Sequence, residues 1–135
     1  MANLNDICKG IVSEVDEALG AAIVDLNTGL LLAAAHNIPY FTQTYLDAVA
    51  AAAVEMFRGK GVTNVEKLLA QMRGEEHSPM MQEVQMTTEK TYHFMVTVPG
   101  KPNALAILVT SRRANLGMGW SAVRSRLPEI APHCP

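Results

Sequence analysis

The segment that comes closest to a chemical signature is residues 117–122, Gly-Met-Gly-Trp-Ser-Ala. It matches the GxGxx(G/A) fingerprint, whose glycines bring a backbone turn close to the pyrophosphate of a dinucleotide at the start of a helix. The fingerprint also needs a second strand and an acidic residue about 20 positions further on, and 13 residues follow Ala122. We therefore interpret these small residues as a close approach between a helix and a sheet, and we expect no cofactor.

Histidines and cysteines are the other residue types considered as metal ligands or nucleophiles. Metal-ligand spacing is absent among the histidines, which are His36, His77, His93 and His133. We expect His93 at the surface, because it lies on the polar side of an alternating strand pattern. Cys8 falls on an apolar helical stripe and is expected to be a buried thiol. A proline-bounded tail holds Cys134 and is predicted to be disordered, so the sequence predicts neither a metal site nor an enzyme.

Arginines form the most prominent charged group, with Arg112, Arg113, Arg124 and Arg126 around the last predicted helix. They indicate either a solvated basic face or a contact for an acidic partner surface, and Arg58, Arg112 and Arg113 are the candidates for partner contact. The whole chain has 11 basic and 13 acidic residues, a formal net charge of −2. This balance, without aromatic residues between the arginines, does not favour binding to nucleic acid or to an anionic membrane.

The composition indicates one globular domain of 135 residues, with 49% hydrophobic and 18% charged residues. We expect the core over about residues 3–127 and a short tail over 128–135. Acidic residues at Asp6, Glu14, Asp16 and Glu17 argue against a signal peptide. The apolar runs are shorter than the about 18 residues that a spanning helix requires. A cytoplasmic protein without membrane insertion is the expectation.

Hydrophobic periodicity predicts the element order α-β-β-α-β-β-β-α. Strands joined by short turns favour an antiparallel sheet, with helices covering its faces. We expect the first two strands, which flank Asn27-Thr28-Gly29, to be covered on both faces. The third and fourth strands alternate and should be half-covered, whereas residues 104–109 should be central. Helices are predicted over about 3–18, 42–58, 64–73 (alone or continuing the preceding helix) and 115–127, and strands over about 19–26, 30–35, 83–88, 91–98 and 104–109.

The middle helix, 42–58, is apolar around most of its circumference, whereas an ordinary surface helix is apolar on one side. One stripe can cover the sheet, and a second stripe then faces solvent unless another molecule covers it. The simpler alternative is that its alanines are merely good helix formers. The large side chains favour self-pairing, with the strand at 84–88 adding edge-to-edge contact. The predicted dimer interface consists of Tyr45, Val49, Ala52, Ala53, Met56, Val84 and Met86.

Three segments together resemble the Roadblock/dynein light-chain family. They are "ALGAAIVDLNTGLLLAAA" (18–35), "YLDAVAAAAVEMF" (45–57) and "ALAILVTSRRANLGMGWSAVRSRL" (104–127). The resemblance covers about residues 3–127, and residues 59–79 look longer than the compact family pattern. It implies a profilin-like α+β fold, a five-stranded antiparallel sheet with one long helix on one face and two on the other.

The same resemblance implies a function. Members of the family form homodimers in which the middle helices pair and the third strands join into one sheet. They are non-enzymatic platforms that bind or regulate small Ras-like GTPases, or serve as light chains of larger complexes. An alternative is a small-ligand sensor with a cleft between sheet and helices, whose adaptable apolar walls would come from Met80, Met81, Met86 and Met95.

Overall fold

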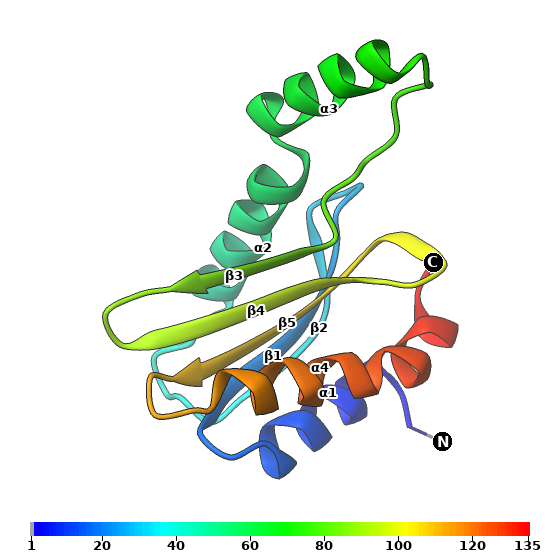
Figure 1. Ribbon diagram of the computed structural model, residues 1–135. Helices are drawn as coiled ribbons and strands as arrows, with labels where there is room; N and C mark the ends of the chain where they lie inside the picture. Colours follow the sequence, from blue (N-terminus) through cyan, green and yellow to red (C-terminus); the bar gives the residue numbers. More distant parts are fainter. Residues whose placement is uncertain (1) are drawn as a thin grey trace.

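The computed structural model describes residues 2–135 and contains one five-stranded sheet with helices on both faces (Figure 1). The helices are α1 (Leu4–Glu14), α2 (Gln43–Arg58), α3 (Lys60–Arg73) and α4 (Leu116–Ile130), followed by the short 3₁₀ helix η1 (Ala131–His133). The strands are β1 (Ala18–Asp25), β2 (Leu30–His36), β3 (Glu83–Thr87), β4 (Thr91–Val98) and β5 (Lys101–Ser111).

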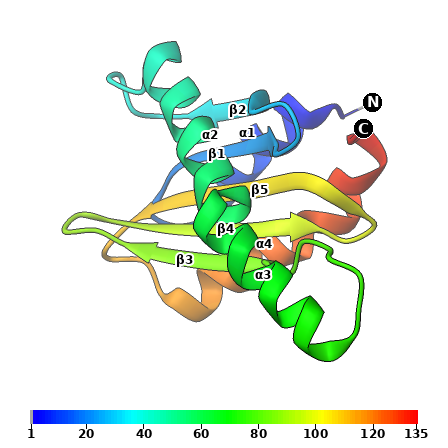
Figure 2. The same ribbon diagram turned by 90° about the horizontal axis from the view of Figure 1, so that it is seen from above.

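The strand order is β2-β1-β5-β4-β3, and every neighbouring pair is antiparallel. The helices α1 and α4 lie side by side on one face, and α2 crosses the other face (Figure 2). The predicted architecture is therefore confirmed, with the middle helix divided into α2 and α3. Gly59 divides it, because its extended backbone (φ −63°, ψ 162°) ends α2. A Cβ at this position would lie 2.4 Å from the Glu55 carbonyl oxygen, which explains the glycine.

Local sequence explains where the first elements begin. Asn3 caps α1 in a capping box, in which its side chain accepts from the Asp6 N–H and the Asp6 carboxylate accepts from the Asn3 N–H. In the β1–β2 turn, the Asp25 carboxylate accepts from the Asn27 N–H at 2.9 Å and the Thr28 hydroxyl at 3.0 Å. Gly29 follows with φ +76°, a conformation that glycine adopts without steric cost. The predicted hairpin is thereby confirmed.

Two apolar clusters hold the layers together, one on each face of the sheet. The cluster under α1 and α4 includes Ile7, Phe94, Leu108, Val123 and Ile130. The cluster under α2 includes Val24, Phe57, Met95, Leu105 and Ile107. Because β1, β4 and β5 contribute to both clusters, the three inner strands are buried on both sides, and this rigid centre positions the edges of the sheet.

The C-terminal prediction is wrong in two respects. Helix α4 passes through Pro128 and ends at Ile130, and the segment beyond it is folded rather than disordered. Pro128 forfeits a hydrogen bond to Arg124 in the last turns, whereas continuing the helix buries Ile130 completely. Cys134 is also buried, so these residues belong to the core that we expected to end at 127.

Strand coverage also differs from expectation. Strand β4 is covered on both faces rather than one, so His93 is 8% exposed and not a surface residue. Strand β4 lies between β3 and β5 and is not an edge strand. Its polar positions are buried together with its apolar ones. Strand β2 is an edge strand and only half-buried. Helix α2 is capped by Thr42, whose side chain accepts a hydrogen bond from the Tyr45 N–H. Among residues 2–135, every helix is too short or too polar to cross a bilayer.

Candidate protein-interaction surface

The outward face of α2 carries small, aromatic and acidic side chains, the acidic ones being Asp47 and Glu55. Tyr45, Ala48 and Ala52 are exposed, and Val49 and Met56 are half-buried. The opposite face packs on the sheet through the fully buried residues Ala50, Ala53 and Phe57. Ala53 has no accessible surface, so its predicted place in a dimer interface is wrong. The helical register turns it toward the β-sheet together with Ala50 and Phe57, three and four residues away on the same stripe.

Strand β3 forms an open edge of the sheet, and in Figure 2 the start of α3 is drawn over it. The Thr88 N–H donates a hydrogen bond to the Thr91 carbonyl of β4. Because bonded and non-bonded residues alternate in an antiparallel pair, the β3–β4 register also directs the backbone groups of the even-numbered β3 residues toward β4. The N–H and C=O groups of Glu83, Gln85 and Thr87 therefore point away from the sheet. Val84 and Met86, both half-buried, join the apolar cluster on the α2 side. The predicted interface residues on β3 thus lie on the face of the sheet that α2 covers.

The other edge of the sheet is partly blocked. Helix α1 packs on β2, and the Asn5 side-chain oxygen accepts a hydrogen bond from the Ala34 N–H at 3.4 Å. An edge covered in this way is a poorer template for strand addition than an uncovered one. The edge that can accept another strand is therefore β3.

Helix α4 fixes β3 from the opposite face, and the sequence did not reveal this arrangement. The Arg124 guanidinium donates two hydrogen bonds to the Glu83 carboxylate, at 2.8 and 2.6 Å, and holds the pKa of that carboxyl below its usual range. Arg124 also lies 4.8 Å above the Trp120 ring, and the Trp120 N–H donates to the Gln85 side-chain oxygen at 3.4 Å. Arg124, one of the four arginines grouped by sequence, therefore has a structural role.

The Gly-Met-Gly segment has the structural role predicted from the sequence, a close approach between a helix and the sheet. Gly119 is buried where α4 crosses the sheet, and a Cβ there would lie 2.4 Å from the Phe94 ring. The Trp120 ring meets the same Phe94 ring edge-on, with centroids 5.3 Å apart. Helix α4 thus approaches β4 closely because Gly119 has no side chain.

The three candidate arginines do not form one site. Arg58 donates to the Asn103 side chain at 3.1 Å and to the Pro102 carbonyl at 2.6 Å, which ties the end of α2 to the start of β5. Arg112 follows the far end of β5, about 30 Å away at roughly 3.3 Å per residue. It donates to the Thr88 carbonyl at 2.9 Å and lies over the Tyr92 ring. Within residues 2–135, the exposed Arg113 guanidinium makes no hydrogen bond or ion pair.

Helix α3 and the segment that follows it enclose an apolar groove, which we call the α3 groove. Its volume is about 500 Å³. Glu66 shapes the groove, because its buried carboxylate accepts hydrogen bonds from the Met80 N–H at 2.5 Å and the Met81 N–H at 3.3 Å. Of the methionines predicted to cluster, Met81 also packs with Met86 and Met95 in the apolar cluster under α2, whereas Met80 lines the groove alone. The lining residues are Gly61, Val62, Val65, Leu69, Met80 and Met81, with Glu66.

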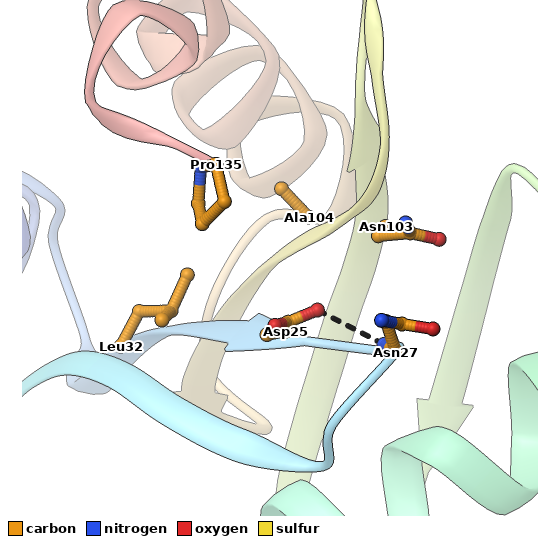
Figure 3. Close-up of a pocket in the computed structure, with 6 residues that line it drawn as sticks. All are labelled: Asp25, Asn27, Leu32, Asn103, Ala104 and Pro135. Atoms are coloured by element: carbon orange, nitrogen blue, oxygen red, sulfur yellow. Dashed lines mark hydrogen bonds between the residues drawn. The ribbon is translucent and has the colours of Figure 1, made fainter.

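A second cavity, of about 130 Å³, lies where the β1–β2 turn meets the start of β5 and Pro135 (Figure 3). Its polar wall is formed by Asp25, Asn27 and Asn103. The Asp25 carboxylate accepts two hydrogen bonds within its own turn, so it stabilises the hairpin. In the described part of the chain, no group of three or more His, Cys, Asp or Glu residues is placed to hold a metal ion.

Comparison with known proteins assigns the fold. No protein-family model and no curated relative matches the chain. Among solved structures, a Roadblock/LC7 domain from Streptomyces avermitilis is 17% identical and superposes with a TM-score of 0.69, covering 98% of both chains. The gliding protein MglB from Thermus thermophilus is 20% identical, with a TM-score of 0.68 over 96% of this chain and 86% of that one. MglC from Myxococcus xanthus is 17% identical, with a TM-score of 0.57 over 93% and 94%.

These similarities define the class of structure: the chain has a Roadblock/LC7 fold over almost its whole length. The resemblance seen in the sequence is confirmed at the level of fold. One MglB structure has a tetrameric arrangement, is 19% identical and has a TM-score of 0.70. This fold therefore occurs in a protein that assembles with itself.

Proposed function

We propose that this chain is a cytoplasmic, non-enzymatic homodimer that serves as a protein-interaction scaffold and binds or regulates a small Ras-like GTPase. The observation that carries the proposal is the juxtaposition of two open surfaces, the β3 edge and the outward face of α2. In Figure 2, α2 crosses the near face of the sheet from β2 toward the edge that β3 forms, so the two surfaces adjoin. One two-fold axis can therefore pair both surfaces with their copies.

The geometry of β3 supports strand pairing across such an axis. Gln85 is the middle residue of β3, and its N–H and C=O point outward. An antiparallel pair of β3 strands centred on Gln85 would exchange these groups and those of Glu83 and Thr87, which gives an isologous contact. The result would be a continuous ten-stranded sheet, with the exposed alanines of the two α2 helices facing each other above it.

Support for a GTPase partner comes from the family that the sequence resembles. A scaffold of this kind acts by binding one conformation of its partner more tightly than another. Arg58 and Arg112 are engaged within the chain, so a role in trans for either would require those bonds to break. Arg113 is the candidate for direct contact with an acidic partner surface. The proposed mechanism is therefore stabilisation of the GTPase's own switch segments, not donation of an arginine finger.

An affinity purification tests the GTPase partner. The tagged chain is incubated with native lysate that contains either GDP or a non-hydrolysable GTP analogue, and bound proteins are identified by mass spectrometry. We expect one small GTPase to be enriched in one nucleotide state, and Arg113→Glu to reduce its recovery. Lys9→Glu, on the exposed side of α1, is the matched control. Recovery of no GTPase in either state would contradict this part of the proposal.

The α3 groove favours one alternative, a module that senses a small apolar ligand. A volume of about 500 Å³ is within the range of small-molecule sites. A thermal-shift screen against metabolites separates the two functions. A reproducible rise in melting temperature with one compound, abolished by Val62→Asp, would favour sensing.

A further inference from the structure

Two patches of exposed apolar side chains flank α2. At the start of the helix, Tyr40, which precedes it, is 73% exposed and Tyr45, in its first turn, is 36% exposed; both pack on Phe41, with ring centroids 5.5 and 4.7 Å apart. We call this group the aromatic patch. After the helix, α3 presents Val65 at 57% exposure and Met72 at 80%. Folded monomers seldom leave two such patches uncovered.

The second patch borders a cavity. Val65 lines the α3 groove, and Leu68, 59% exposed, lies one helical turn further along α3. The groove is held open by the Glu66 carboxylate, which binds the backbone of Met80 and Met81. In Figure 1, α3 stands away from the sheet on the α2 side, and the groove opens to the surface where its lining residue Val65 is exposed.

We infer that the α3 groove of one copy receives the aromatic patch of a second copy, in a contact that both copies make. This inference rests on the proposed homodimer and adds a second contact to it. Aromatic side chains that fill an apolar pocket are typical anchors of protein interfaces. Tyrosine suits the position, because the ring can enter the groove while the hydroxyl reaches solvent.

The two-fold symmetry of the proposed dimer brings these parts together. In an isologous interface, residues before the axis contact residues after it. Ala52 lies in the middle of the exposed α2 face, with Tyr45 seven residues before it and Gly59 seven residues after it. Tyr40 is twelve residues before Ala52, and Asn64 is twelve residues after it. Antiparallel α2 helices therefore place the aromatic patch of one copy beside the first turns of α3 in the other.

The charges of the two helices are complementary in the same arrangement. The exposed acidic residues of α2 are Asp47 and Glu55. The exposed charged residues of α3 are all basic, because its single acidic residue is buried beside Met80 and Met81; they are Lys60, Lys67 and Arg73. Asp47 lies five residues before Ala52 and Lys60 lies eight residues after it, so antiparallel association brings Asp47 of one copy near Lys60 of the other, whereas parallel association would not.

Site-directed cross-linking tests the contact. The variant Tyr40→Cys with Val65→Cys is treated with a short bis-maleimide and separated on a denaturing gel. The native cysteines do not compete, since both are buried and burial raises the pKa of the Cys8 thiol to about 12. We expect a covalent dimer from the double variant. The control is Lys9→Cys with Val65→Cys, which places one thiol on the other face of the sheet and should remain monomeric on the gel.

A second measurement keeps failure of this contact distinct from failure of the dimer. Val65→Asp should raise the dimer dissociation constant at least about tenfold without altering thermal unfolding of the monomer, because Val65 is mainly exposed. A dimer in light scattering that gives no cross-link and tolerates Val65→Asp would overturn the α3 contact alone. A wild-type monomer would overturn the proposed dimer and this contact together.

Discussion

Glu83 on the edge strand and Arg124 on α4 form a two-point contact, with N–O distances of 2.8 and 2.6 Å. This contact joins the strand proposed for dimerisation to a helix on the opposite face of the sheet. Hydrogen bonding and charge from Arg124 lower the pKa of the Glu83 carboxyl. The edge strand is thus tied to α4 by a pair that no sequence pattern marked.

The first prediction concerns that pair. Glu83→Gln keeps the size of the side chain and removes its charge, so the hydrogen bonds to Arg124 weaken and β3 opens more often. Hydrogen–deuterium exchange should become faster in residues 83–88 and remain unchanged in β1. Because the folded pKa is lowered, the wild-type contribution is present above the unfolded pKa of Glu83 and is lost as pH falls through the folded value. The variant should lack that pH dependence. Glu129→Gln, on the solvent side of α4, is the control.

The second prediction tests the β3 edge directly. Gln85→Pro removes an outward N–H and places the ring where a second strand would pair, without affecting the β3–β4 ladder. We expect a folded monomer with the 14.6 kDa mass of one chain in light scattering. Met86→Pro removes an inward N–H and should instead lower the melting temperature. A Gln85→Pro protein that remains dimeric would exclude β3 as the interface.

The third prediction tests α2. Ala52→Arg and Met56→Glu each place a charge on the outward face of the helix, and an unpaired charge buried in an interface costs about 3 kcal/mol or more. Both variants should be monomeric at micromolar concentration and retain the wild-type circular dichroism. Lys9→Glu should remain dimeric. An unchanged mass for both α2 variants would show that this face is not the interface.

The fourth prediction concerns His93, whose burial was not expected. Desolvation lowers the pKa of His93, and its ring nitrogen shares a hydrogen bond of 2.9 Å with the Thr91 hydroxyl. Since the folded pKa lies below the unfolded value of about 6.5, folding disfavours protonation. The contribution of His93 to the free energy of unfolding should therefore be fully present above about pH 6.5 and be lost as pH falls through the folded pKa.

Urea unfolding at a series of pH values measures this effect. A conservative replacement, His93→Gln, should reduce the loss of unfolding free energy between neutral and mildly acidic pH. His133→Gln changes an exposed histidine and should leave the pH profile unaltered. Equal profiles for wild type and His93→Gln would show that other groups control the acid sensitivity.

Local periodicity predicted most of the elements, because apolar spacing along the chain reflects burial of one face. It could not predict which strands lie at the edges, since that depends on long-range pairing. His93 is buried because both faces of β4 are covered, and Ala53 faces the sheet because of the rotation of α2, which the uniform alanines did not reveal. The α3 groove depends on a contact between Glu66 and the backbone of Met80, a pairing without a sequence signature. Helix α4 continues beyond Pro128 because the burial of Ile130 outweighs one lost hydrogen bond.

The last prediction concerns Gly119, the glycine that lets α4 approach the sheet. A methyl group there would lie 2.4 Å from the Phe94 ring, and Phe94 is itself packed against Trp120. Gly119→Ala should therefore destabilise the fold by about 1–3 kcal/mol through overpacking, although alanine is the better helix former. Gly61→Ala is the matched control, since nothing lies within 4 Å of the position that its methyl group would take. The control should stabilise α3 by about 0.5–1 kcal/mol. Chemical denaturation measures both, and equal stabilisation of the two variants would show that the α4–β4 approach can relax.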